Sequence, residues 1–184
     1  MRLFIASPFP EEILRALNER LASVKPKLPP ASWVRPETQH LTFSFLGEQE
    51  ESLIEPLVAG LRVVLAPIAH FDAALQGCGF FPNARRARVG WVGVEPEERF
   101  SEVAAAVRDA VKASGVELDR ADFKAHLTLM RIRDRWPRTA IEAFENAMRD
   151  FRSAPFPVDR VTLFSSRLSS KGAIHTALGE FALS

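Results

Sequence analysis

The tripeptide His40-Leu41-Thr42 recurs 86 residues further along the chain as His126-Leu127-Thr128. The stretch Pro10-Glu11-Glu12 recurs at the same separation as Pro96-Glu97-Glu98. A proline followed by acidic residues is typical of the first turn of a helix. Because both matches share one separation and fall at the same point in the order of predicted elements, they indicate an internal duplication.

The remaining predicted elements also correspond in pairs at about this separation: strands over 2–7 and 88–94, helices over 50–65 and 136–151, and strands over 71 onward and 157–164. Each half then reads as strand, helix, strand with His-Leu-Thr, helix and strand pair. Since the strand-rich blocks contain predicted hairpins, the sequence favours an α+β fold with antiparallel sheets over a doubly wound parallel sheet.

The duplication predicts one domain over residues 1–184 with two internal repeats, roughly 1–86 and 87–184, whose lobes can interleave. Two repeats are too few for a solenoid. We expect two lobes related by a pseudo-two-fold axis, with antiparallel sheets lining a central cleft and helices outside. Each lobe would bring one His-Leu-Thr motif to the cleft.

Composition narrows the class of protein. The chain has 184 residues, and 47% of them are hydrophobic, which is enough for a sizeable core. Its 24 basic and 23 acidic residues give a net charge of +1, which excludes a protein that coats nucleic acid through its overall field. Because 19 of the 24 basic residues are arginine, the composition does not exclude a local phosphate-binding site.

The sequence favours a reducing compartment, because a single cysteine, Cys78, excludes an internal disulfide. The sequence contains no run of about 18 apolar residues, so it does not predict a membrane span. The apolar start over residues 1–10 is too short for a signal peptide and is typical of a strand ended by prolines. We therefore expect a soluble cytoplasmic protein with no membrane partner.

Residues i and i+2 of a strand share a face, so His40 and Thr42 point one way and Leu41 the other. An imidazole exchanges protons near neutral pH, and two imidazoles facing across a cleft form an acid–base pair. Opening a cyclic phosphate needs such groups on opposite sides of phosphorus. A metal site has less support, because the nearby acids Glu37 and Asp122 lack ligand spacing.

At these residues the chain resembles the 2H phosphoesterase superfamily, named for two His-x-Thr/Ser-x motifs. It is more closely similar to the bacterial and archaeal RNA 2',3'-cyclic phosphodiesterases, also called 2'-5' RNA ligases. This similarity runs from end to end, through residues 2–6, 33–37, 40–48, 79–91, 123–131, 163–168 and 171–173.

The resemblance implies hydrolysis of a terminal RNA 2',3'-cyclic phosphate to a 2'-phosphomonoester, without metal or nucleotide cofactor. It implies His40 as the proton donor to the 3'-oxygen and His126 as the proton acceptor that activates water. Thr42 and Thr128 would bind phosphate oxygens, with Arg131 near the phosphate. Weak 2'-5' ligation would be the reverse reaction. The implied partner is RNA with a 2',3'-cyclic phosphate end, and no obligate protein partner is indicated.

Two departures from the family affect substrate preference. Ala125 stands where the family often has proline, and His175 where an aromatic residue, often tyrosine, is usual. The chain has no tyrosine, so any base stacking must come from Phe, Trp, His or Arg.

Other candidates have a structural reading beside a functional one. We expect Cys78 to be a buried structural thiol, and His70 to be structural or on the surface. His175 is either structural or at the cleft rim. We expect Trp33 and Phe123 to belong to the core rather than to a base-stacking platform.

Arginines form two groups. Arg85, Arg86 and Arg88 form either an edge that tracks phosphates or the solvated face of a hairpin. The densest basic run follows the second motif, and we expect at least one member to contact RNA phosphate: Arg131, Arg133, Arg135 and Arg138.

Two alternative functions stay open beside the cyclic phosphodiesterase. One is a non-catalytic module that binds RNA ends or nucleotides, which would bind a cyclic-phosphate RNA without turnover. The other is a phosphodiesterase of the same superfamily that acts on small cyclic nucleotides. Comparison of kcat/KM for an oligonucleotide and a mononucleotide distinguishes this second alternative from a phosphodiesterase that acts on RNA ends.

Overall fold

The computed structural model describes residues 1–118, 122–169 and 172–184. Its elements follow the chain in this order: β1 (Arg2–Pro8), α1 (Glu11–Val24), β2 (Ser32–Trp33), β3 (His40–Glu48), α2 (Ile54–Leu65), β4 (Phe71–Phe81), β5 (Val89–Glu95), α3 (Glu97–Ala113), β6 (His126–Arg131), α4 (Arg138–Met148), β7 (Phe156–Val158), β8 (Arg160–Ser169) and β9 (Gly172–Ala182). Pro10 and Pro96 directly precede α1 and α3, as the sequence predicts.

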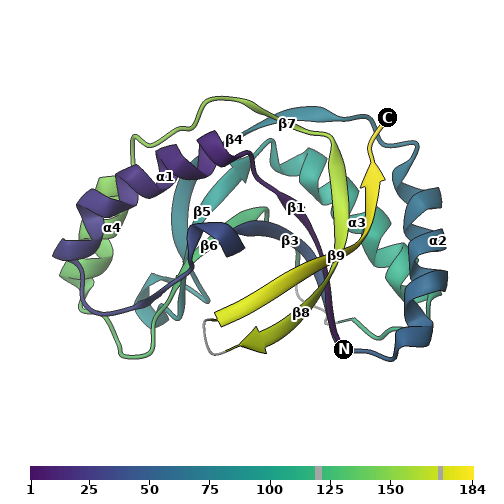
Figure 1. Cartoon of the computed structure of the whole chain (residues 1–184). Coiled ribbons are helices and arrows are strands. Elements are labelled where there is room, and N and C mark those ends of the chain that lie inside the picture. Colours follow the sequence, from purple (N-terminus) through teal and green to yellow (C-terminus); the bar gives the residue numbers. More distant parts are fainter. Residues whose placement is uncertain (119–121, 170–171) are drawn as a thin grey trace.

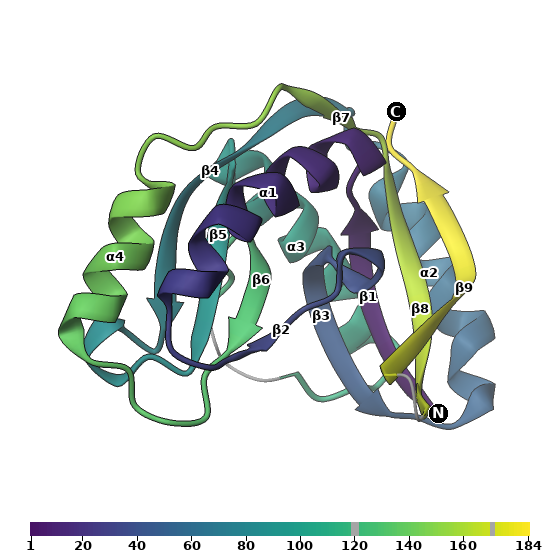
Figure 2. The same ribbon diagram turned by 60° about the vertical axis from the view of Figure 1, so that its left-hand side comes forward.

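The strands form one antiparallel sheet in the order β7-β4-β5-β6-β3-β1-β8-β9, with β2 paired to β6 beside this path. This arrangement confirms the α+β class. Helices α1 and α4 lie together at one end of the molecule, and α2 and α3 lie together at the other (Figures 1 and 2). Among the described residues, no helix has the length and apolar character needed to cross a membrane.

The sheet divides into two groups of strands, and each group draws on both halves of the sequence. Strand β4 comes from the first half but pairs with β5 of the second half. Strand β8 comes from the second half but pairs with β1 of the first. Each group therefore contains strands from both halves of the sequence.

The two groups join where β3 pairs with β6. In the described part of the chain this pairing consists of one position, Leu41 opposite Leu127. Both leucines are buried, with 0% and 1% of their surface exposed. The Leu41–Leu127 pair joins the two groups, so the predicted antiparallel sheets are the two parts of one continuous antiparallel sheet.

Helix α1 buries one face, because its apolar residues recur at intervals of three or four: Ile13, Leu17, Leu21 and Val24. A part-buried polar contact ties this helix to the start of β3. The Asn18 amide nitrogen donates to the Gln39 side-chain oxygen at 2.9 Å and to the Leu14 carbonyl at 2.7 Å. Gln39 precedes His40, so the contact fixes the backbone where the first motif begins.

Candidate active site

A cavity of about 790 Å³ lies where β3 and β6 meet. Its lining comes from β3, β6, the adjoining ends of β4 and β5, the segment before β6, and one face of α3. It includes both motifs and their neighbours: His40, Thr42, Phe43, Ser44, Phe45, Phe81, Val89, Ser101, Ala104, Ala105, Arg108, Leu118, Asp122, Phe123, Lys124, His126, Thr128 and Arg131.

Both His-Leu-Thr motifs present the same face to this cavity. In each motif the leucine is buried, while the histidine and threonine on either side are half-buried and line the cavity. This is the alternation that an extended strand imposes. The structure thus brings His40, Thr42, His126 and Thr128 together, although they lie far apart in the sequence.

His40 is held between aromatic rings. Its ring stacks on Phe4 of β1, with centroids 4.8 Å apart, and meets the ring of His175 of β9 edge-on at 5.4 Å. Burial, and then the charge of a protonated His175, lower the pKa of His40 to about 4, against the opposing effect of a hydrogen bond with the Thr38 backbone. His40 is therefore neutral at pH 7 in this environment.

His126 has a similar environment in the other group of strands. Phe81 meets its ring edge-on at 4.8 Å, and the Trp91 ring of β5 lies 6.3 Å away. Burial lowers the pKa of His126, and the Lys124 ammonium lowers it further, while a hydrogen bond to the Lys124 backbone raises it. His126 Nδ1 lies 2.7 Å from the Lys124 carbonyl oxygen.

This hydrogen bond sets the tautomer of His126. A carbonyl oxygen can only accept, so Nδ1 carries the proton and the Nε2 of the neutral ring keeps its lone pair. The lone pair on Nε2 suits a proton acceptor. His40 likewise bonds to the backbone two residues before it, so the two histidines are held in corresponding ways.

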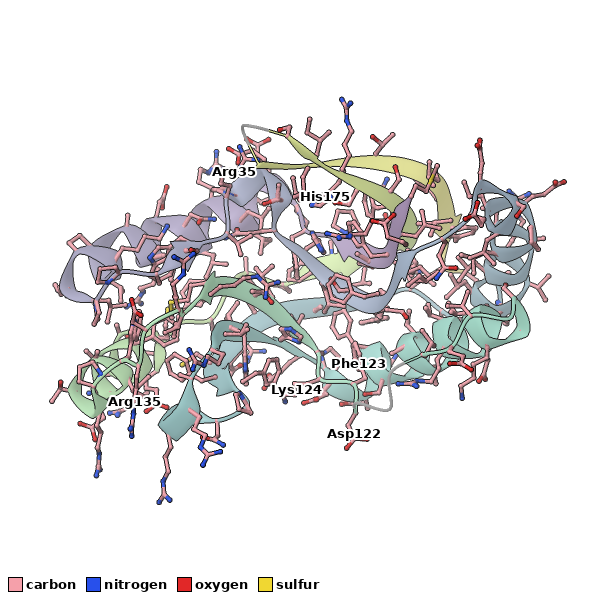
Figure 3. The ribbon with its side chains drawn as sticks, turned by 90° about the horizontal axis from the view of Figure 1, so that it is seen from below. Arg35, Asp122, Phe123, Lys124, Arg135 and His175 are labelled. Carbon is pink, nitrogen blue, oxygen red and sulfur yellow. The ribbon has the colours of Figure 1, made fainter. Side chains whose placement is uncertain are left out.

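Positive charge gathers at the cavity. Arg131 is exposed at the end of β6 and lines the cavity. Lys124 also lines it, and its ammonium forms an ion pair with Glu97 and lies 5.8 Å from the centroid of the Trp91 ring. Figure 3 shows Lys124, Phe123 and Asp122 on one side of the molecule and Arg35 and His175 on the opposite side.

Three other candidate residues lie outside the cavity lining, namely Cys78, His70 and Trp33, whereas Phe123 belongs to it. Burial and the neighbouring Glu145 raise the pKa of the half-buried Cys78 thiol to about 11, which disfavours the nucleophilic thiolate. His70 is exposed, and its Nδ1 lies 2.9 Å from the Ser184 carbonyl oxygen. Trp33 is half-buried under the Lys25 ammonium and outside the cavity lining. Phe123 both packs on Phe43, with centroids 6.0 Å apart, and lines the cavity.

The aromatic supports of the two histidines were not identified from the sequence. Phe4 precedes His40 by 36 residues and Trp91 precedes His126 by 35, so these two rings do not keep the 86-residue separation of the motifs, and that separation does not reveal them. Phe45, which is 68% exposed and lines the cavity, was also missed. Two register shifts between β1 and β3 interrupt the strand alternation near Phe45, and no local sequence pattern announces them.

Within the described ranges, no group of three or more His, Cys, Asp or Glu side chains could hold a metal ion. The reaction's independence of metals stays a prediction, and the test is activity in a chelator.

Comparison with known proteins relates the whole chain to one family. Residues 10–169 match the 2'-5' RNA ligase superfamily. The RNA 2',3'-cyclic phosphodiesterase of Thermus thermophilus is 35% identical over 192 residues, which cover 100% of this chain and 90% of that protein. The protein of the same name from Archaeoglobus fulgidus is 33% identical over 193 residues, covering 98% and 99%.

Solved structures show the same arrangement of elements. The crystal structure of TT0787 of Thermus thermophilus superposes with a TM-score of 0.79 at 31% identity, covering 100% of this chain and 98% of that one. The crystal structure of E. coli LigT complexed with 3'-AMP superposes with a TM-score of 0.78 at 25% identity, with the same coverage.

Proposed function

This chain belongs to the 2'-5' RNA ligase superfamily, and from that membership we propose that it hydrolyses the 2',3'-cyclic phosphate at an RNA end to a 2'-phosphomonoester. One observation carries the proposal: two His-Thr pairs from different strands line one cavity. The names of its full-length relatives, RNA 2',3'-cyclic phosphodiesterases, support the same substrate class.

In the proposed reaction a water molecule attacks phosphorus while the bond from phosphorus to the ribose 3'-oxygen breaks. His126 takes a proton from the water, and His40 gives a proton to the leaving 3'-oxygen. The two protons balance, and the 2'-oxygen keeps the phosphate. The free lone pair on His126 Nε2 supports the acceptor role, because its Nδ1 is engaged by the Lys124 carbonyl.

The donor role requires a proton on His40, whose pKa is lowered to about 4 by burial and by His175. An anionic phosphodiester placed beside the imidazole favours the charged ring and raises that pKa. Substrate binding therefore supplies the condition for protonation. After product release, the ring returns to the neutral form that its buried position favours.

Thr42 and Thr128 would donate hydrogen bonds to the non-bridging phosphate oxygens. Arg131 would balance their charge from the end of β6, where it lines the cavity. Ligation would follow the same path with the hydroxyl of a second ribose attacking phosphorus in place of water while the bond to the 3'-oxygen breaks, which leaves a 2'-5' linkage, and we expect it to be weak.

The test is turnover of an oligonucleotide that ends in a 2',3'-cyclic phosphate, in the presence of EDTA. We expect EDTA-resistant conversion to a 2'-phosphate, identified by its resistance to a phosphatase specific for 3'-phosphates. A 3'-phosphate product would contradict the proposed bond cleavage. Binding without product after long incubation would identify a non-catalytic RNA-end module instead.

A further inference from the structure

Five exposed arginines lie together at the edge of the cavity: Arg85, Arg86, Arg88, Arg133 and Arg135. We call them the arginine patch. We infer that this patch binds backbone phosphates of the RNA strand upstream of the cyclic end, so that the substrate is an oligonucleotide rather than a mononucleotide. The inference rests on the proposed function and assigns the substrate class of the same site.

Hydrogen bonds bring the two segments of the patch together, although Arg88 and Arg133 are 45 residues apart in the sequence. The backbone of Ile132 donates to the Arg88 carbonyl at 2.8 Å, and the Arg88 guanidinium donates to the Arg133 carbonyl. The Asn83 side chain accepts from the backbone of Arg85 and of Arg86, each at 3.1 Å. These bonds fix the backbone of the turn, and they involve the guanidinium of Arg88 but not those of Arg85 and Arg86, which are exposed.

The patch is continuous with the cavity. The Arg88 backbone donates to the Phe81 carbonyl at 2.8 Å, and Phe81 lines the cavity. The next residue, Val89, pairs with Arg131, and both of these also line the cavity. An RNA end in the cavity would therefore leave past Arg131 directly onto the patch.

The charge of the patch is largely unneutralised. In the described part of the chain, none of its five arginines forms an ion pair, whereas Arg138 nearby pairs with Glu142 at 2.6 Å. One carboxylate, Asp134, lies between Arg133 and Arg135 in the sequence. Figure 3 shows Arg135 at the outer edge of the molecule, on the same side as Lys124.

The chemistry of the patch fits an RNA backbone. A guanidinium forms two parallel hydrogen bonds to phosphate, and such contacts hold a strand without reading its sequence. A net charge of +1 shows that the chain as a whole has little attraction for RNA. Its attraction is concentrated where a strand would leave the cavity, and a mononucleotide would have no phosphate there to contact.

The test compares two double variants with the same change in net charge. Arg86→Ala/Arg135→Ala alters the patch, and Arg15→Ala/Arg62→Ala alters exposed arginines of α1 and α2 that lie outside the cavity lining. Both are assayed with a cyclic-phosphate oligonucleotide of about six nucleotides, a length within the range of single-strand binding sites, and with a cyclic mononucleotide.

For the patch variant we expect KM for the oligonucleotide to rise about tenfold. The salt dependence of binding should decrease by about 0.7 in slope for each phosphate that the variant no longer neutralises. Its kcat/KM for the mononucleotide should stay unchanged, and the control variant should match the unmodified chain with both substrates. Equal effects on both substrates, or no effect on the oligonucleotide, would overturn the inference.

Hydrolysis and binding are measured separately, so failure of the proposed function is distinguished from failure of this inference. If the unmodified chain hydrolyses neither substrate, the reaction is wrong, and fluorescence anisotropy with the 2'-phosphorylated oligonucleotide still measures binding to the patch. Weaker binding by the patch variant alone would sustain the inference. Equal binding by both double variants would reject it.

Discussion

Leu41 of β3 lies directly opposite Leu127 of β6, and this pair is the midpoint between the two motifs. If the antiparallel register continues one residue on either side, His40 faces Thr128 and Thr42 faces His126. Each histidine is then the neighbour of the threonine from the other motif. All four side chains line the same cavity, so we expect one phosphate bound there to contact them all.

Loss of either imidazole should remove most of the activity. We expect His40→Ala and His126→Ala each to lower kcat by about 10²–10⁴-fold, the usual contribution of a general acid or base. His70→Ala is the matched control, because His70 is exposed and bonds only to the Ser184 carbonyl among the described residues. Full activity in either cavity variant would rule out the mechanism.

A sulfur leaving group should distinguish the donor from the acceptor. A cyclic phosphorothiolate with sulfur at the 3'-bridging position leaves without needing a proton. We therefore expect this substrate to restore turnover to His40→Ala and to leave His126→Ala inactive. Rescue of His126→Ala instead would exchange the two roles.

The two threonine hydroxyls should matter through their hydrogen bonds alone. Thr42→Val and Thr128→Val keep the shape of the side chain and remove the donor. A hydrogen bond to a charged group contributes about 1.5–3 kcal/mol, so kcat/KM should fall by roughly 10- to 150-fold. Thr→Ser at the same positions should recover most of it, and equal loss in the serine and valine variants would show that the methyl group matters instead.

The pH profile of kcat/KM should lie at lower pH than the ordinary pKa of an imidazole would give. Because kcat/KM reports the free enzyme, and the pKa values of His40 and His126 are both lowered, we expect both limbs of the profile below pH 6.5. His175→Phe removes a cationic neighbour while keeping a ring against Phe4. This change should raise the pKa of His40 and move the high-pH limb upward.

The corresponding control is His70→Phe, which should leave the profile in place. A profile centred on the ordinary imidazole pKa, or one that His175→Phe does not move, would contradict the described environment of His40.

A methyl group at Gly79 should disturb the position of the His126 ring without touching it. Gly79 lies opposite Trp91, and a Cβ there would collide with the Trp91 ring, which lies beside His126. We expect Gly79→Ala to cost about 1–3 kcal/mol of stability and to lower kcat/KM by up to about 100-fold.

Gly60→Ala is the matched control in α2, since the new Cβ would lie 3.8 Å from Ala110 Cβ, an ordinary contact. It should raise Tm, because alanine is favoured over glycine within a helix by about 1 kcal/mol. An unchanged Tm and activity in Gly79→Ala would show that the Trp91 position is not needed.

The parts of the fold that depend on local pattern could be predicted. Pro10 and Pro96 mark the starts of α1 and α3, and the antiparallel α+β class follows from the hairpins between short strands. The repeated motif also identified four residues that line the cavity, because strand alternation places each histidine and threonine on one face. Their roles stay predictions, as do the duplication and a cytoplasmic location.

The remaining features depend on contacts between distant segments. The pairing of Leu41 with Leu127 decides that the sheet is continuous, and neither sequence segment specifies the other. The register shifts near Phe45 depend on β1, and the low pKa of His40 depends on Phe4 and His175 from two other strands. These contacts form only when the chain folds, so no local sequence pattern predicts them.

The exchange of strands between the two halves has a consequence for how the chain folds. During synthesis, β1 emerges long before its partner β8. Strand β4 likewise emerges before its partner β5. Each half therefore depends on strands of the other half for part of its backbone pairing. A cut between β4 and β5 should therefore give two fragments that are unfolded apart and assemble only when mixed, so that both histidines are acquired in a single cooperative event.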